Sequence, residues 1–493
     1  MSARKISIIM LLVILSAGCK SWGKFWVPNS FVISTNPAYV GSIVTLGSAS
    51  GFDFNSVQTV KIGETTSLLL SKNSETLKFF VMPGTTSGQV NLLLSSDAVT
   101  SEESLTILQA AVLASQQGPK LVGTGNVGAA SQGYSVALSS DGNTAMMGAR
   151  QDNTNEGAVW VFTRSGTAWL QQGTKITATG NIGAARLGQS VALSAEGNTA
   201  IVGAHSDNAN TGAAFIFVRS GAAWSQQAKL VGTGSVGASQ QGFSVSISAD
   251  GNTAAIGGNL DNSVEGGAWV FVRSGTAWVQ QGTKLVGTGN ATPAEQGRSL
   301  ALSADGNTLL LGGNQDNTNQ GAGWVFTRSD GIWSQQGSKL LGSGNTGAAR
   351  QGFSVALSAD GNAAVLGGIA DNANNGATWV FIRSGAAWSQ QGAKLVGSGN
   401  SGAANQGQSV GISADGNTVI IGGNIDNSNQ GAAWIFRRSG TIWSQQGTKL
   451  VGAGNTGAAE QGFSVSISSD ATTGISGGYL DNTGEGAAWV WVP

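Results

Sequence analysis

Few side chains in this chain of 493 residues could carry catalysis. His205 is the only histidine and Cys19 the only cysteine, and there are three tyrosines. Acid–base or nucleophilic catalysis needs several converging titratable groups, but the sequence shows no Ser-His-Asp or Cys-His arrangement and no metal-ligand spacing of His and Cys. His205 stands at a turn position that other stretches fill with Arg150, Asn259 or Ile369, which predicts a solvated loop residue. We therefore expect no enzyme and no catalytic residue.

The most regular polar feature is an aspartate followed by an asparagine, which recurs seven times. The aspartates are Asp152, Asp207, Asp261, Asp316, Asp371, Asp426 and Asp481. Asp and Asn side chains bond the backbone two residues on and so stabilise turns. Recurrence in every copy favours a shared structural role in a turn. A ring of ion or ligand sites is the alternative.

The residue two places before each of these aspartates differs from copy to copy. These residues are Arg150, His205, Asn259, Asn314, Ile369, Asn424 and Tyr479. A constant scaffold with varied loop positions is typical of binding surfaces on rigid folds, although neutral drift gives the same pattern. We predict that these seven residues mark a ligand face.

A second set of acidic residues raises the question of calcium. A calcium loop needs several oxygen ligands at alternating positions. The stretch Ala304-Asp305-Gly306-Asn307 offers one carboxylate in a tight hairpin. We therefore predict no metal site, no cofactor, and no dependence of stability on calcium.

These features are positioned by an internal repeat. The acidic residues Asp141, Glu196, Asp250, Asp305, Asp360, Asp415 and Asp470 follow one another at steps of 54 or 55 residues. A fixed period of this size indicates a repeat architecture. Within Gly407 to Leu450, turn signals separate four strand-like runs, of which the second is continuously apolar and the fourth more polar.

Seven copies of a four-stranded unit predict an all-β fold, a seven-bladed β-propeller over residues 113–493. The alternative, a β-solenoid, repeats at shorter intervals. The seventh copy stops after its third strand, whereas Ser115 to Leu121 matches the fourth strand of the others. We therefore expect this segment to complete the last blade and close the ring, which hides both sheet edges.

The repeats resemble FG-GAP repeats, the blade unit of integrin α-subunit propellers and of many bacterial surface proteins. The resemblance covers Ser115 to Pro493 and rests on a glycine that recurs at the Phe-Gly step. In the seven copies this glycine is, in order, Gly133, Gly188, Gly242, Gly297, Gly352, Gly407 and Gly462. The Phe position is mostly Gln, as at Gln351 and Gln406, and the family's Gly-Ala-Pro step has lost its proline. Fold carries over from such a resemblance more firmly than function does.

The N-terminal part is divided into three segments. Residues 1–19 are typical of a lipoprotein signal peptide that ends in Ser16-Ala-Gly-Cys19, so Cys19 is expected to carry the lipid. An ordinary secretory signal is the alternative. Residues 20–30 are expected to be a tether. Residues 31–108 resemble an IPT/TIG domain, a small immunoglobulin-like β-sandwich, on features such as Gly51-Phe52 and Ile62-Gly63.

Together these features predict an exported bacterial protein, anchored in the cell envelope by a lipid, in the outer membrane and exposed at the surface. We expect a monomeric propeller that recognises a protein or glycan without catalysis, as an adhesion module would. A scaffold subunit of an envelope assembly complex and a saccharide-active enzyme with paired carboxylates are the alternatives. The net charge of −1 gives no reason to expect a nucleic-acid partner.

In a propeller, the loops that enter the first strands and the turns between second and third strands share one face. Residues 399–405 form one such entering loop, and the varied residues lie on the same face. Near-identical Asp-Gly-Asn and Arg-Ser-Gly turns are expected on the opposite face. A ligand is expected to dock on the varied face, across several blades near the axis, with Arg150, His205, Ile369 and Tyr479 as its large anchors.

Overall fold

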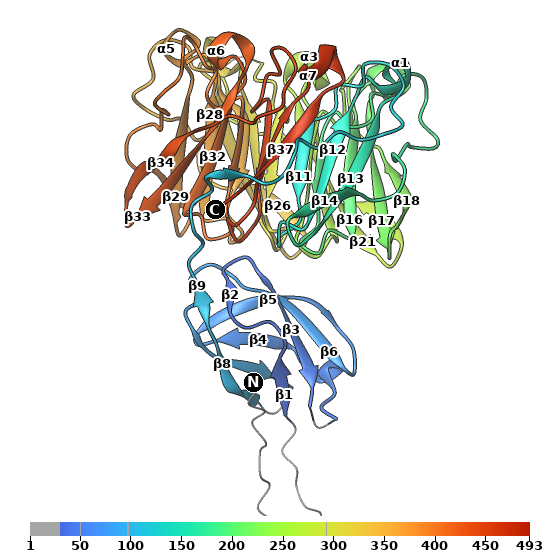
Figure 1. Cartoon of the computed structure of the whole chain (residues 1–493), viewed down its shortest axis with the longest axis vertical. Coiled ribbons are helices and arrows are strands. Elements are labelled where there is room, and N and C mark those ends of the chain that lie inside the picture. The colour runs from blue at the N-terminus through green and yellow to red at the C-terminus, as the bar shows by residue number, and fades with distance from the viewer. Residues whose placement is uncertain (1–29, 50, 96–97, 292) are drawn as a thin grey trace, which may run out of the picture.

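The computed structural model describes residues 30–49, 51–95, 98–291 and 293–493. They form two units, a small N-terminal one and a large ring of sheets that lies on top of it in Figure 1. The ring consists of seven four-stranded antiparallel sheets, which confirms the predicted all-β, seven-bladed β-propeller. The expected signal peptide, residues 1–19 with Cys19, and residues 20–29 of the expected tether lie outside the described residues.

The blades are numbered in chain order, and each runs from a first strand at the axis to a fourth strand at the rim. The first strands are β11 (Ser135–Leu138), β15 (Val191–Leu193), β19 (Ser244–Ile247), β23 (Ser299–Leu302), β27 (Gln351–Leu357), β31 (Ser409–Ile412) and β35 (Ser464–Ile467). The second strands are β12 (Thr144–Ala149), β16 (Thr199–Ala204), β20 (Thr253–Gly258), β24 (Thr308–Gly313), β28 (Ala363–Gly368), β32 (Thr418–Gly423) and β36 (Gly474–Gly478).

The outer half of each blade is built in the same way. The third strands are β13 (Ala158–Ser165), β17 (Ala213–Ser220), β21 (Gly267–Ser274), β25 (Ala322–Ser329), β29 (Ala377–Ser384), β33 (Ala432–Ser439) and β37 (Ala487–Val492). The fourth strands are β14 (Ala168–Gln171), β18 (Ala223–Leu230), β22 (Ala277–Gln280), β26 (Ile332–Gln335), β30 (Ala387–Gln390), β34 (Ile442–Leu450) and, in blade 7, β10 (Ser115–Gln116).

Packing explains why each strand has its own composition. Every residue of the second strands is buried, because both faces of these strands lie against neighbouring blades. The fourth strands alternate between exposed and half-buried residues, as in β30. A continuous apolar run therefore lies inside the blade, and the more polar run forms its outer edge, as the sequence predicts.

Ring closure follows the prediction. β10 pairs with β37 in antiparallel register, with Ser115 opposite Val492. Leu121 continues the pairing through a bridge to Ala488. The first residues of the propeller thus form the outer edge of its last blade, and the ring is held together by segments from both ends of the repeat region.

A glycine, a tryptophan and a glutamine form a packed set in six blades. In blade 5 the amide of Gly342 donates to Gln351 Oε1 at 2.6 Å, and Gln351 Nε2 donates back to the Gly342 carbonyl at 2.8 Å. A Cβ on Gly342 would lie 2.1 Å from Cδ1 of the buried Trp379. The glutamine therefore takes the Phe position of the Phe-Gly step because it satisfies both backbone groups of a glycine that the indole covers.

Blade 2 fills the same space differently. Ala178 replaces the glycine, Phe215 the tryptophan and Leu187 the glutamine. Phe215 and Leu187 are buried in one apolar cluster, against which Ala178 packs. The smaller ring leaves room for the added methyl group, and the apolar leucine replaces the amide. The three positions have changed together, which indicates that they are energetically coupled.

The N-terminal unit is a seven-stranded antiparallel sheet in the order β1-β3-β6-β5-β4-β7-β8. Its strands are β1 (Phe31–Ile33), β3 (Ile43–Ser48), β4 (Thr59–Ile62), β5 (Thr65–Lys72), β6 (Thr76–Phe80), β7 (Gly88–Leu93) and β8 (Ala98–Leu105). A 3-10 turn, η1 (Phe54–Ser56), and a short parallel pair, β2 (Ala38–Tyr39) with β9 (Ile107–Leu108), complete it. β5 pairs with β4 through its first half and with β6 through its second, so the strands enclose one apolar core. Its classification as immunoglobulin-like stays a prediction.

The N-terminal unit covers the propeller face that carries the Asp-Gly-Asn turns (Figure 1). Phe80 is 2% exposed and packs with Ala195, Ala359 and Ala414, which immediately precede acidic turn residues in three blades. A cavity of about 150 Å3 separates Phe80 from the ends of the first strands and is lined by residues of all seven blades. Lys78 forms an ion pair with Glu196 at 2.7 Å. The axis of the ring is therefore capped on this side.

Candidate ligand-binding face

The opposite face carries the aspartate turns together with the loops that enter the first strands. The turns are α1 (Asp152–Asn155), α2 (Asp207–Asn210), α3 (Asp261–Val264), α4 (Asp316–Asn319), α5 (Asp371–Asn374), α6 (Asp426–Asn429) and α7 (Asp481–Gly484). In blade 6, the entering loop and the turn exchange bonds, because Ser401 N donates to Asp426 Oδ1 at 2.7 Å and Asn427 N donates to Ser401 O at 3.0 Å. The expected pairing of these segments on one face is confirmed.

Each of the seven turns is left-handed, although it is drawn as a short helix. In blade 6, Asn427, Ser428 and Asn429 have φ values of 50, 57 and 67°. Asn tolerates this conformation better than other non-glycine residues because its side chain can bond locally. The recurring asparagine after each aspartate is therefore explained by backbone geometry.

The seven aspartates are buried and paired with lysines. Each is at most 1% exposed, and its Oδ1 accepts an amide of the entering loop at 2.6–2.8 Å. Each Oδ2 meets a lysine ammonium group. The pairs are Asp152–Lys175, Asp207–Lys229, Asp261–Lys284, Asp316–Lys339, Asp371–Lys394, Asp426–Lys449 and Asp481–Lys120. Because both oxygens are engaged within the blade, the arrangement supports the structural interpretation of this ring.

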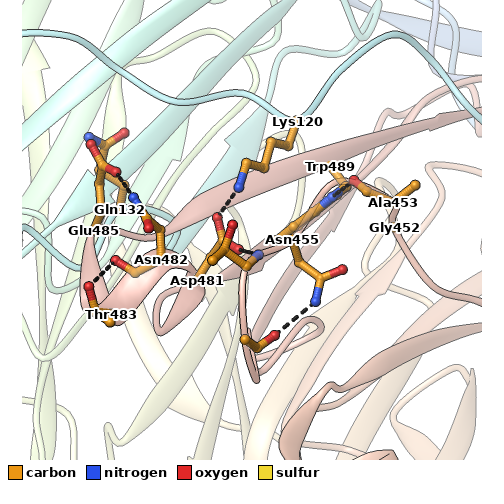
Figure 2. A network of polar contacts seen from close by, with 12 residues as sticks. Lys120, Gln132, Gly452, Ala453, Asn455, Asp481, Asn482, Thr483, Glu485 and Trp489 are labelled. Carbon is orange, nitrogen blue, oxygen red and sulfur yellow. Dashed lines mark hydrogen bonds and ion pairs between the residues drawn. The ribbon is translucent and has the colours of Figure 1, made fainter.

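Figure 2 shows this arrangement in blade 7, where the lysine comes from the other end of the repeat region. Lys120 follows β10 and reaches Asp481 at the start of α7. Beside it, Trp489 Nε1 donates to the Ala453 carbonyl at 2.8 Å. Sequence reasoning missed the lysines, although a lysine 23 residues after each aspartate in blades 1, 3, 4, 5 and 6 was a readable signal. Ring closure thus includes a buried ion pair as well as strand pairing.

The varied residues lie at the inner ends of the second strands and contact residues that begin the first strands. Tyr479 packs edge-to-face on Phe463, with ring centroids 4.5 Å apart, and Phe463 lies 4.8 Å from Tyr134. The Arg150 guanidinium stacks 3.8 Å from the Tyr134 ring centroid and donates to Gln189 Oε1 at 3.1 Å. Blades 7, 1 and 2 thus join in one aromatic and cationic cluster around the axis.

The cluster continues across blades 3 to 5. Arg298 lies between two rings, 4.0 Å from the Phe353 centroid and 5.4 Å from that of Phe243. Its nearest described carboxylate, Glu295, is 3.9 Å away, which is beyond hydrogen-bond distance. Burial lowers the pKa of Arg298, and burial raises the pKa of Glu295. Both observations indicate charges that are poorly solvated near the axis.

The prediction for His205 is wrong. Its side chain is only 5% exposed and contacts the Phe243 ring edge-to-face at 5.8 Å, so it is not a solvated loop residue. Burial, and then the positive charges of Arg150 and Arg186, lower its pKa to about 3. The imidazole is therefore neutral at pH 7. His205 directly follows the second strand β16 and is buried against Phe243, which directly precedes the first strand of the next blade.

The remaining varied residues are also buried or half-buried. Asn259, Asn314 and Asn424 are 3%, 3% and 6% exposed, and Ile369 is half-buried. The three amide oxygens are buried and have no hydrogen-bond partner among the described residues. Asn424 Nδ2 donates to Glu460 at 2.8 Å. Buried amides that keep an unpaired acceptor are uncommon in proteins.

Sequence reasoning missed the second ring of varied residues, which begins the first strands. It consists of Tyr134, Gln189, Phe243, Arg298, Phe353, Gln408 and Phe463. The signal was present, because each follows the recurring glycine of the Phe-Gly step and differs from blade to blade. This glycine has positive φ and lies against neighbouring backbone, which holds the next residue at the axis.

No metal centre is found in the part of the chain that the structure describes, where no group of three or more His, Cys, Asp or Glu could hold an ion. In the Asp-Gly-Asn turns the carboxylate serves the turn itself. Asp305 accepts bonds from the Ser303 hydroxyl, the Asn307 amide and the Asn307 side chain. Among the described residues, no helix has the length and apolar character needed to cross a membrane.

Comparison with known proteins finds one family match. The FG-GAP repeat model matches residues 169–217, which run from the fourth strand of blade 1 to the third strand of blade 2. No curated protein matches the chain. Among solved structures, Kuenenia stuttgartiensis hydrazine synthase is 13% identical, with a TM-score of 0.46 over 72% of this chain and 95% of that one. That likeness carries no argument about function. The chain thus contains an FG-GAP repeat within a seven-bladed β-propeller.

Proposed function

We propose that this protein is a non-catalytic binding module that recognises a protein or glycan through the varied face of its propeller. The observation that carries this proposal is the cap on the other face. Phe80 and its neighbours occupy the side with near-identical turns, whereas no described segment covers the side where side chains differ (Figure 1). Specific recognition needs large anchors in an asymmetric arrangement, and the axial cluster supplies them.

The second part of the proposal concerns location. The N-terminal unit lies on the side of the propeller away from the varied face (Figure 1). A lipid on Cys19 would tether the chain from this side, and the varied face would then point away from the membrane. Cys19→Ser is expected to release the protein from membranes or leave it unprocessed. Unchanged fractionation and mass of the mature chain would contradict the anchor.

The binding role is tested by screening the mature protein on arrays of glycans and extracellular-matrix proteins, with pull-down of envelope proteins beside it. Arg150→Ala and Tyr479→Ala are expected to weaken any ligand that is found. Asp305→Ala and Arg383→Ala change residues of the opposite face and serve as controls. Greater sensitivity at the control positions would overturn the assignment of the face. Capture of envelope partners alone would favour a scaffold role.

A further inference from the structure

The centre of the varied face holds more positive than negative side chains. Arg150 and Arg186 lie close enough to His205 to lower its pKa, and Arg350 lies close enough to Arg298 to lower the pKa of that arginine. Glu295 and Glu460 occupy the positions that Arg186 and Arg350 have in other blades. These four arginines and two glutamates carry an excess of two positive charges, whereas three further carboxylates of the same face, Glu156, Glu265 and Glu485, follow the aspartate turns α1, α3 and α7. The Asp–Lys pairs further out cancel one another. Attraction for an anion on this face is therefore local to the arginines and is not a property of the whole face.

Two of these arginines are held by aromatic rings rather than by carboxylates. Arg150 stacks on Tyr134, and Arg298 lies between Phe243 and Phe353. The Nε atoms of both are buried without a hydrogen-bond partner among the described residues. Ring stacking fixes a planar guanidinium, and the Arg298 side chain remains 22% exposed to a ligand. Arg298 has only the distant Glu295 as a counter-ion, at 3.9 Å, and no carboxylate is paired with Arg150 among the described residues, so an added anion would stabilise both partly buried charges.

On the opposite face, the arginines that lie over aromatic rings do have hydrogen-bond partners for their Nε atoms. Arg383 lies 5.7 Å from the Trp388 ring, further than Arg150 from Tyr134, and its Nε donates to Asn362 Oδ1 at 2.8 Å. Arg164, Arg219, Arg273, Arg328 and Arg438 make the equivalent bond at 2.8–3.0 Å. The fold can therefore satisfy a stacked arginine, and it does so wherever the arginine belongs to the repeat.

The ligand must also satisfy apolar surfaces and unpaired acceptors. Phe463, Tyr479 and Tyr134 form one aromatic group at the axis, and Phe353 and Phe243 form another. The amide oxygens of Asn259 and Asn314 have no donor among the described residues but are buried, so a ligand reaches them only if the amide turns by half a turn, which exchanges its donor and acceptor. A carboxylate alone offers no donor and no apolar face. A sugar acid offers hydroxyl donors, an apolar ring face and a carboxylate together.

From these contacts we infer that the axial centre of the varied face binds an acidic saccharide, whose carboxylate lies against the guanidinium groups of Arg150 and Arg298. The sugar rings stack on the neighbouring aromatic side chains. Phe80 caps the axis on the other side, so the saccharide enters and leaves through the varied face. This inference rests on the proposed binding role and adds the chemical class of the ligand.

The test is calorimetric titration of the full mature chain with defined probes. The probes are trigalacturonate, its trimethyl ester and triglutamate, each at low and high salt. Trigalacturonate is expected to bind at least about tenfold more tightly than the ester, because charge-assisted bonds are about twice as strong as neutral ones. Its affinity is expected to fall as salt rises.

The variants separate the charge from the fold. Arg150→Gln with Arg298→Gln is expected to weaken trigalacturonate at least about tenfold. Arg186→Gln with Arg350→Gln removes the same number of charges from less buried positions and is expected to weaken binding by a smaller factor. Arg164→Gln with Arg383→Gln is the matched control on the opposite face and is expected to leave affinity unchanged. Thermal melting of each variant verifies that it folds.

The outcomes also separate this inference from the proposed function. Equal binding of acid and ester, lost in Tyr479→Ala, would keep the binding face but overturn the acidic ligand. Binding of triglutamate without trigalacturonate would overturn the saccharide in favour of an acidic peptide. Failure of all three probes would overturn the inference, whereas the arrays decide the binding role independently. Equal loss in the opposite-face control would overturn both.

Discussion

The two faces of the propeller differ in how their side chains are held. On the face toward the N-terminal unit, each acidic turn residue bonds within its own turn, as Asp305 does with Ser303 and Asn307. On the varied face, the aspartates make the same bonds to the entering loops in every blade. The varied residues nearer the axis instead contact one another. Arg150, for example, contacts Tyr134 and Gln189, and the residue type at each of these positions differs between blades.

The two kinds of contact distinguish residues that every blade needs, such as the aspartates, from residues that only one blade carries, such as Arg150. Asp426 accepts a backbone amide, which any residue except proline can supply at position 401. The aspartate can therefore stay constant while the entering loop varies. Arg150 and Arg298 have no equivalent in the other blades, and no recurring bond of the fold explains them. Residues with individual partners on a shared scaffold are those that a ligand can select.

The largest effect is expected where the framework of the blade has no spare volume. Gly342→Ala places a Cβ 2.1 Å from the Trp379 ring, and we expect unfolding free energy to fall by about 3 kcal/mol or more. Adding Trp379→Phe and Gln351→Leu reproduces the set found in blade 2 and is expected to restore much of the loss. Denaturant unfolding of the single and triple variants measures this coupling. If the triple variant is less stable than the single variant, blade 2 must accommodate Ala178 through further sequence differences outside these three positions.

The next effect compares the two faces directly. Asp426→Asn removes the charge that pairs with the largely buried Lys449, and a loss of about 2 to 3 kcal/mol is expected, less than for a fully buried pair. Asp305→Asn makes the same chemical change in an exposed turn and is expected to cost less than about 1 kcal/mol. Both are measured by chemical denaturation at neutral pH. Equal costs would mean that the buried ring adds nothing beyond its turns.

The sequence was sufficient for the framework because the framework repeats. A period of 54 or 55 residues, an apolar second strand and a displaced copy of Ser115 to Leu121 determine blades, burial and closure without any knowledge of angles. The same reasoning placed the varied residues on the face of the loops that enter the first strands. What repeats seven times can be read from one chain, because each copy tests the interpretation of the others.

The axial cluster could not be derived in this way, because its contacts join different blades. Nothing in the neighbourhood of His205 along the chain indicates that Phe243, in the next blade, would bury it. The second ring was also missed because Tyr134, Arg298 and Phe463 show no common chemistry. The contact between the two units rests on Phe80, which in the sequence is one apolar residue of an ordinary strand.

The third prediction uses pH to test the burial of His205 in the varied face. Its pKa of about 3 in the folded protein lies below the ordinary 6.5, so the unfolded chain takes up the proton first as pH falls. The stability due to the neutral imidazole is complete above pH 6.5 and is lost between 6.5 and 3. We expect the wild type to lose about 2 to 3 kcal/mol more than His205→Asn between pH 7 and 4.5.

Asparagine is the matched replacement because Asn259, Asn314 and Asn424 occupy the same position in other blades. Urea unfolding of both proteins across this pH range provides the difference and cancels the contribution of shared carboxylates. Parallel curves would show that His205 is solvated after all, as the sequence predicts. The varied face would then be more open than its contacts indicate.

The smallest effect is expected on the covered face, at the ion pair between Lys78 and Glu196. These side chains are 41% and 26% exposed, and exposed pairs contribute between zero and about 1 kcal/mol. Lys78→Ala should therefore leave the N-terminal unit docked and shift the unfolding free energy by less than about 1 kcal/mol. Phe80→Ala removes a ring that is 2% exposed and should cost several times more. Limited proteolysis between the two units reports docking separately from stability. If Lys78→Ala alone frees the N-terminal unit, the contact between the two units depends on charge rather than on apolar packing. High salt would then expose the face with the Asp-Gly-Asn turns. Both faces would be open to a ligand, and the cap would no longer favour the varied face as the binding face.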